Sequence, residues 1–153
     1  MSTHTALIRW KQDEDDHFTL GRYTRVHEIF FDGGTTIETS GAPGNVPAQF
    51  SSEVSVDPEE LFVASLSSCH MLWFLDIARR ANVEILAYED NAEGVMEKDR
   101  QGRTAITKVT LRPKIETEQE VGADKLADLH KQAHDACFIA NSVKTAVVVE
   151  PVS

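Results

Sequence analysis

The feature that most constrains this sequence is an apolar run over residues 61–75, which contains no formally charged side chain. Its 15 residues fall short of the roughly 20 that a helix needs to cross a bilayer, and three serines and His70 interrupt it. Because the run is apolar nearly all round, it predicts a helix buried on most sides in a protein core. We therefore expect no membrane-spanning segment and no membrane partner.

Signals at both ends of this run set the bounds of the helix. Asp57 is a good N-cap, and Glu60 three residues later completes a capping-box pattern, with proline at the first helical position. Arg79 and Arg80 suit the last turn, where cations interact favourably with the helix dipole. The pattern predicts a helix from Asp57 to about Ala81.

Strand and turn patterns account for most of the remaining chain. A hairpin turn is predicted at Asp32-Gly33-Gly34, an irregular loop over residues 40–56 and a second helix over residues 123–139. Strands are predicted over residues 5–10, 22–31, 35–39, 83–97, 104–115 and 145–149. Strands and helices that follow one another in groups predict an α+β fold, here as a single domain over residues 1–153.

Charge and cysteine content exclude several classes of protein. The net charge of −10, from 25 acidic and 15 basic residues, argues against binding to nucleic acid or to an anionic membrane. The first ten residues lack the pattern of a signal peptide, so we expect a cytoplasmic location. Two cysteines without a CxxC motif form neither a disulfide framework nor a typical zinc site. In a reducing compartment such a pair is more often catalytic or redox-active than structural.

The two cysteines lie on different predicted helices, 68 residues apart. Cys69 is midway along the first helix, and Cys137 is near the end of the second. Each alone is read most simply as a small buried apolar residue, since free cysteine is among the most buried residue types. A shared role for the two thiols requires the fold to bring them together.

The surroundings of both cysteines match a known pattern. Residues 57–70, Asp-Pro-Glu-Glu-Leu-Phe-Val-Ala-Ser-Leu-Ser-Ser-Cys-His, resemble the signature of the OsmC/Ohr (osmotically inducible / organic hydroperoxide resistance) family, in which Pro-Glu-x-Leu precedes a reactive cysteine. Residues 134–142, around Cys137, resemble the segment that carries the family's second cysteine. The resemblance covers nearly the whole chain. It implies an OsmC-like fold, with antiparallel sheets packed on a long buried central helix, in an intertwined homodimer.

The resemblance implies a cysteine-based peroxidase of the oxidative stress response that needs no cofactor. Cys69 would attack the O–O bond of an organic hydroperoxide and become a sulfenic acid. Cys137 would condense with it to a redox-active intrachain disulfide, which an external dithiol would reduce. Aromatic residues such as Phe62 and Trp73 favour an organic hydroperoxide over hydrogen peroxide.

The family also uses a glutamate and an arginine at its site. Glu59 matches the glutamate of the Pro-Glu segment, and either Arg22 or Arg25 matches the arginine of the early strands. A cation is needed because a thiol in an apolar helix resists ionisation and only the thiolate attacks. Otherwise each of these three residues is an ordinary surface charge.

The spacing of Glu59 and Cys69 limits how they can cooperate. Ten residues correspond to roughly 15 Å along an unbroken helix. Either the helix breaks between them, or Glu59 serves the Cys69 of a second subunit. The second possibility again indicates a homodimer.

Two alternatives stay open at this point. The chain could be a non-catalytic dimer that binds a small apolar ligand. It could also bind zinc, because His130, His134 and Cys137 share one helix face. Phe138 departs from the family pattern, in which proline often follows the second cysteine. The branch of the family to which the chain belongs, and whether that branch is catalytically active, therefore stay open.

Overall fold

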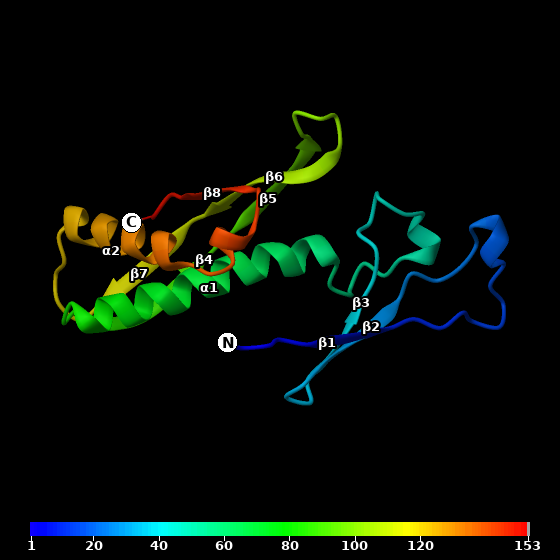
Figure 1. Cartoon of the computed structure of the whole chain (residues 1–153), viewed down its shortest axis with the longest axis horizontal. Helices are drawn as coiled ribbons and strands as arrows, with labels where there is room; N and C mark the ends of the chain where they lie inside the picture. The colour runs from blue at the N-terminus through cyan, green and yellow to red at the C-terminus, as the bar shows by residue number, and fades with distance from the viewer. Residues whose placement is uncertain (153) are drawn as a thin grey trace. The chain divides into compact units, whose positions relative to one another are not determined.

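The computed structural model describes residues 1–152 and has the predicted α+β architecture (Figure 1). The chain divides into two compact units, which we call the N-terminal unit (Met1–Leu61) and the C-terminal unit (from Phe62 onward). The helices are α1 (Pro58–Arg80) and α2 (Ala123–Ala136), and three 3-10 helices are η1 (Phe18–Leu20), η2 (Ala48–Phe50) and η3 (Ala140–Ser142). Helix α2 ends three residues before the predicted limit of 139.

The N-terminal unit holds an antiparallel sheet in the order β1 (Ala6–Arg9), β2 (His27–Phe31) and β3 (Thr36–Thr39). The predicted turn joins β2 to β3, and Gly34 adopts a φ of 87° there, which a residue without Cβ reaches at no steric cost. Strand β2 starts later than predicted, because the Arg25 amide donates instead to the Phe50 carbonyl at 2.8 Å.

The capping box at the start of α1 forms as predicted. The Glu60 amide donates to Asp57 Oδ1 at 2.7 Å, and the Asp57 amide donates to Glu60 Oε2 at 3.0 Å. Two otherwise unpaired amides at the helix start are thereby satisfied. At the other end the helix stops just before Asn82, whose φ of 57° is in the left-handed region that commonly ends helices.

The C-terminal unit contains two sheets. Strand β4 (Ile85–Asp90) pairs with β7 (Pro113–Thr117), and a second sheet has the order β5 (Glu93–Lys98), β6 (Thr104–Leu111) and β8 (Ala146–Val149). All pairings are antiparallel except that of β6 with β8, which is parallel.

The predicted strands 83–97 and 104–115 are each divided between the two sheets, so the interpretation of each as one strand is wrong. Asp90, the last residue of β4, connects the places where the two predicted strands divide. Its Oδ1 accepts the Arg112 amide, between β6 and β7, at 2.6 Å, and its Oδ2 accepts the hydroxyl of Ser67 on α1.

The core of the C-terminal unit has two parts, both packed on α1. The C-terminal half of α1, through Phe74 and Ala78, packs with Leu129 and Ala133 of α2, which lies alongside it in Figure 1. The N-terminal half packs through Leu66 on strands β6 and β8. The fully buried residues of α1 are Leu66, His70, Phe74 and Ala78, spaced four apart.

The burial of α1 is therefore narrower than its composition predicts. Only this stripe is fully buried in the single chain, and Leu72 is 61% exposed. By length and composition alone α1 would pass as a membrane span. Core helices of soluble proteins pass the same test, so the length and composition of α1 are only weak evidence for a membrane-spanning helix.

Candidate active site

The two cysteines, 68 residues apart in the sequence, lie near each other in the C-terminal unit. Cys69 is in the middle of α1, and Cys137 is the residue at which α2 ends. Both thiols are free. The folding of α2 against α1 therefore creates the proximity that a shared role requires.

The environments of the two thiols differ. Cys69 is half-buried, whereas Cys137 is 1% exposed. The Ala140 amide donates to Cys137 Sγ at 3.4 Å. Burial, with the nearby Cys69 adding to its effect, raises the pKa of the Cys137 thiol to about 11. Cys137 is consequently a protonated thiol at neutral pH, and Cys69 is the more accessible of the two.

An aromatic pair stands beside the cysteines. Trp73 lies one turn beyond Cys69 on α1, and Phe138 directly follows Cys137. Their rings meet edge to face with centroids 5.2 Å apart, a favourable aromatic geometry. The departure from the family's proline therefore gives the segment after Cys137 a contact with α1.

The two candidate arginines have different surroundings in the N-terminal unit. Arg22 is exposed. Arg25 is half-buried: its guanidinium donates to the carbonyls of Gly21 and Tyr23 and lies 3.6 Å from the Tyr23 ring centroid. The contacts fix Arg25 as an oriented cation.

Glu59 lies in the first turn of α1, where its Oε1 accepts the Asn45 side-chain amide at 3.5 Å. Helix α1 is unbroken from Pro58 to Arg80. The possibility that a break brings Glu59 to Cys69 of its own helix is thereby removed, and about 15 Å of helix axis separates them.

The sequence interpretation of the histidines was incomplete, because His70 and His130 form a buried pair between α1 and α2. His70 Nε2 and His130 Nδ1 are 3.1 Å apart, and the two side chains are 1% and 3% exposed. His130 also stacks on Phe74 with centroids 4.2 Å apart. The sequence contains one signal for the burial of His70, which is its four-residue spacing from Leu66 and Phe74 on the same helix face.

Burial keeps this histidine pair neutral. Burial is the main reason why the pKa of both His70 and His130 is lowered to about 4, and for His70 the neighbouring imidazoles of His130 and His134 contribute to the same shift. Within residues 1–152 no three histidine, cysteine or acidic side chains are grouped to hold a metal ion. The zinc alternative built on His130, His134 and Cys137 thus has no support.

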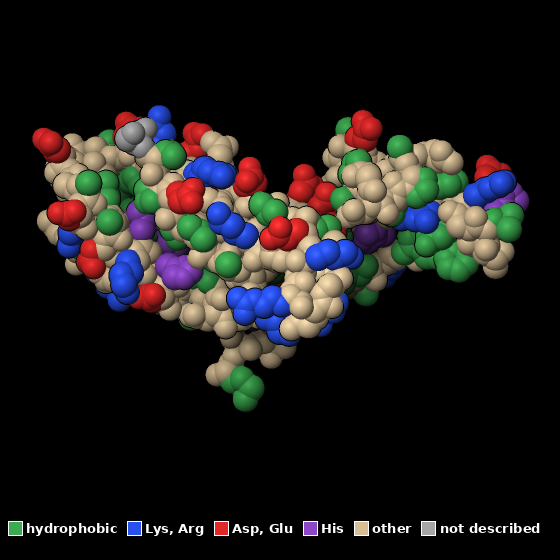
Figure 2. All heavy atoms as spheres, turned by 90° about the horizontal axis from the view of Figure 1, so that it is seen from above, with side chains coloured by type: hydrophobic (Ala, Val, Ile, Leu, Met, Phe, Trp, Pro, Cys, Tyr) green, Lys and Arg blue, Asp and Glu red, His purple; other side chains and the backbone are tan. Residues whose placement is uncertain are grey.

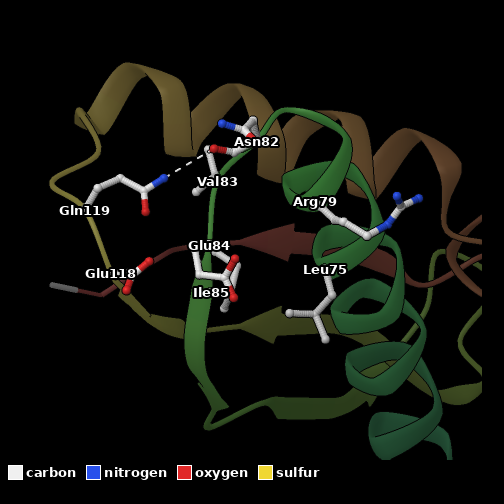
Figure 3. Close-up of a pocket in the computed structure, with 8 residues that line it drawn as sticks. All are labelled: Leu75, Arg79, Asn82, Val83, Glu84, Ile85, Glu118 and Gln119. Carbon is white, nitrogen blue, oxygen red and sulfur yellow. Dashed lines mark hydrogen bonds between the residues drawn. The ribbon is translucent and has the colours of Figure 1, made fainter.

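A cavity of about 660 Å³ lies at the C-terminal end of α1, away from the cysteines (Figure 3). Leu75, Val83 and Ile85 supply its apolar wall, and charged side chains, including Arg79, stand at its edge. The Gln119 side-chain amide donates to the Asn82 carbonyl at 3.3 Å across one side. Neither cysteine lines this cavity.

Residues 51–152 match the sequence pattern of the OsmC-like protein family. The chain belongs to this family. The match includes both cysteines and Glu59, whereas Arg22 and Arg25 lie before it. No curated protein matches the chain.

Solved structures place this OsmC-like protein among relatives with the same fold. It is 45% identical to an OsmC-like protein of unknown function from Vibrio cholerae, with a TM-score of 0.97 over 99% of this chain and 100% of that one. The organic hydroperoxide resistance protein OhrB of Bacillus subtilis is 22% identical, with a TM-score of 0.72 over 99% and 98% of the two chains. An organic hydroperoxide resistance protein from Elizabethkingia anophelis is 18% identical, with a TM-score of 0.71 over 99% and 94%. The last two show a shared fold.

The OsmC/Ohr family comprises peroxide-resistance proteins and includes cysteine-based peroxidases. This OsmC-like protein has the two neighbouring cysteines that such chemistry needs.

Proposed function

We propose that this OsmC-like protein is a thiol-dependent peroxidase that reduces organic hydroperoxides to alcohols, acting in the cytoplasm. The observation that carries the proposal is the pairing of a half-buried Cys69 with a buried, protonated Cys137. A peroxidatic thiol must meet a substrate from solvent, whereas a resolving thiol must stay unreactive until the first step is complete. The Trp73–Phe138 pair beside them offers apolar contact to an organic group.

The proposed reaction proceeds in three steps. The Cys69 thiolate attacks one oxygen of the hydroperoxide, the O–O bond breaks, and the alkoxide takes a proton to leave as an alcohol. The sulfur of Cys137 then attacks the Cys69 sulfenic acid, an S–S bond forms, and the hydroxyl leaves with the Cys137 proton as water. An external dithiol reduces the disulfide by exchange and restores both thiols.

Thiol counting tests this proposal directly. One equivalent of cumene hydroperoxide should remove both thiols and produce an intrachain disulfide detectable by peptide mass mapping. Cys69→Ser should remove the reaction, and Cys137→Ser should stop at a sulfenic acid on Cys69. Retention of both thiols in the unmodified protein under these conditions would contradict the proposal.

We further propose a homodimer in which Glu59 and Arg25 of one subunit complete the site around Cys69 of the other. The unbroken α1 supports this arrangement, as does the apolar surface that α1 leaves open, including Leu72 at 61% exposure. Arg25 is preferred to Arg22 because its guanidinium is already oriented. In this role it would stabilise the Cys69 thiolate, and Glu59 would hold it in place.

Mixed dimers test the shared site. Cys69→Ser and Arg25→Ala subunits, inactive alone, should regain activity when unfolded and refolded together, because one site of each hybrid is complete. Random pairing predicts about a quarter of the unmixed wild-type activity. Arg22→Ala is the matched control and should be active alone. A lack of regained activity despite hybrid formation would refute the shared site while leaving the thiol chemistry untouched.

A further inference from the structure

An exposed aromatic ring holds the segment that follows α2 against α1. Phe138 is 67% exposed, yet its ring meets that of Trp73 edge to face, with the two planes at 85°. On the face of the C-terminal unit that Figure 2 shows, apolar side chains are scattered among acidic and basic ones, and a single exposed apolar side chain is ordinary. The defined ring contact, and not the exposure, is therefore what sets Phe138 apart.

This ring contact runs beside the contact between the two thiols. Trp73 follows Cys69 by four residues on α1, so the two side chains lie on one face of the helix, about one turn apart. Cys137 and Phe138 are consecutive residues where α2 ends. The thiols of Cys69 and Cys137 are neighbours, and the rings of Trp73 and Phe138 meet one turn further along α1. Together the two pairs fix the register of the α2 end along α1.

A disulfide tolerates little error in this register. Its two Cα atoms must come within about 4.4–6.8 Å of each other, whereas one turn of helix is about 5.4 Å long. A slip of the α2 end by about one turn along α1 would thus carry Cys137 out of reach of Cys69. The contact between Trp73 and Phe138 opposes such a slip, because the two rings would have to separate.

Hydrogen bonds within the turn after α2 connect Phe138 to its neighbours. The Cys137 carbonyl accepts the Asn141 amide at 3.0 Å, and the Phe138 carbonyl accepts the Ser142 hydroxyl at 2.7 Å. On another side of the turn, Ile139 packs against the core cluster that includes β6. Because the turn is bonded internally, a restraint on the Phe138 ring also restrains the Cys137 backbone. Removal of the exposed ring leaves the core packing of Ile139 in place.

We propose that Phe138 is a positioning residue, which holds Cys137 in register with Cys69 through its contact with Trp73 and so speeds disulfide formation. Its part in catalysis rests on the proposed function, where it would act in the second step. In that step the Cys137 sulfur attacks the Cys69 sulfur, an S–S bond forms and the S–O bond breaks. The hydroxyl leaves as water with the Cys137 proton.

A disulfide-exchange reaction tests this positioning without any hydroperoxide. One equivalent of dithiobis(nitrobenzoate) should react with the more accessible Cys69, release one nitrothiobenzoate and leave the other in a mixed disulfide. Attack by the Cys137 sulfur on Cys69 then forms the intrachain disulfide and releases the second nitrothiobenzoate, while the Cys137 proton goes to solvent. The absorbance of nitrothiobenzoate follows both releases. The second release is first-order within one chain, so its rate measures how well Cys137 is placed.

Variants of the two rings give the expected changes in this second rate. Phe138→Ala should slow it by about twofold to tenfold, the factor that corresponds to the loss of one aromatic pair, and Phe138→Tyr should restore it. Trp73→Leu should slow it by a similar factor. The double variant should be no slower than either single one, because the two rings act through one contact. Leu86→Ala, at a residue 57% exposed on β4, is the matched control and should keep the wild-type rate.

Three results would overturn the proposal. An unchanged or faster second release in Phe138→Ala would show that the ring does not hold Cys137 in place for attack. Release in Phe138→Tyr as slow as in Phe138→Ala would show that the ring contact is not the cause. Labelling of both cysteines in the wild type, without a disulfide, would show that Cys137 is not positioned to attack. Retention of both thiols with cumene hydroperoxide beside a normal exchange reaction would contradict only the peroxidase, and would leave the positioning by Phe138 supported.

Discussion

Mild acid should destabilise the C-terminal unit through the buried His70–His130 pair. Both imidazoles are neutral in the folded protein, with pKa values lowered from 6.5 to about 4 by burial. An unfolded chain has no such burial, so its histidines gain protons first as the pH falls. The stabilisation is complete above pH 6.5 and is lost progressively as the pH falls from 6.5 through 4.

The size of the effect follows from the pKa difference. For His70, 6.5 minus about 4 is about 2.5 pH units, worth about 3 kcal/mol at ~1.36 kcal/mol per unit. His130 acts in the same direction. The nearby Asp90 opposes the effect on His70, whereas His134 adds to it. A loss of about 3 kcal/mol is a large part of the roughly 5–15 kcal/mol that stabilises a typical domain.

Urea unfolding at pH 7.5, 6.0 and 5.0 checks this prediction. The double variant His70→Leu, His130→Leu removes both partners together and so leaves no orphaned nitrogen. Between pH 7.5 and 5.0, the free energy of unfolding of the wild type should fall by at least about 2 kcal/mol more than that of the double variant. His4→Gln, at an exposed histidine, is the control and should behave as the wild type. Equal pH dependence in the wild type and the double variant would refute the reasoning.

Three further predictions concern a thiol, a close contact and a helix cap. At pH 8, iodoacetamide should label Cys69 well before Cys137, because a pKa of about 11 leaves only ~0.1% of Cys137 as thiolate; mass mapping of equal labelling would contradict this. Gly94→Ala should cost about 1–3 kcal/mol, since a Cβ there would lie 2.6 Å from Val63 Cγ2; denaturant unfolding should show relief when Val63→Ala is added. Asp57→Ala should cost about 1 kcal/mol through loss of the helix cap, and an unchanged melting temperature would count against that role.

The sequence was most informative where short-range chemistry decides the structure. The capping box fixed the start of α1 to within one residue, because Asp57 and Glu60 satisfy each other's amides. The β2–β3 turn was equally clear, since only glycine reaches the φ of Gly34 at no steric cost.

The sequence was least informative where contacts between residues far apart in the chain determine the structure. Residues 83–97 contain no break strong enough to predict two strands. The division depends on Asp90 bonding to the Arg112 amide and to Ser67, from strands and a helix far along the chain. The burial of His130 is likewise set by its partner 60 residues away. Neither contact leaves a local pattern.

The candidate site shows the same contrast. The resemblance pointed to both cysteines, and the fold brings them near each other. The large difference in burial between the two thiols was not predictable, because it depends on which of them the rest of the folded chain covers. The roles of Glu59, Arg22 and Arg25 stay predictions, and the proposal that a second subunit brings them to Cys69 is tested by the mixed dimers.

The parallel pairing of β8 with β6 has a consequence for how the protein is made. Val147 pairs with Val109, and Cys137 lies in the connection that leads from α2 to β8. This connection is anchored at its far end only when residues 146–149 have left the ribosome and docked, a non-local step that is intrinsically slow. Until then, both thiols are present in a nascent chain that does not yet hold them in place. Until β8 has docked, the fold therefore does not govern which partner each thiol meets.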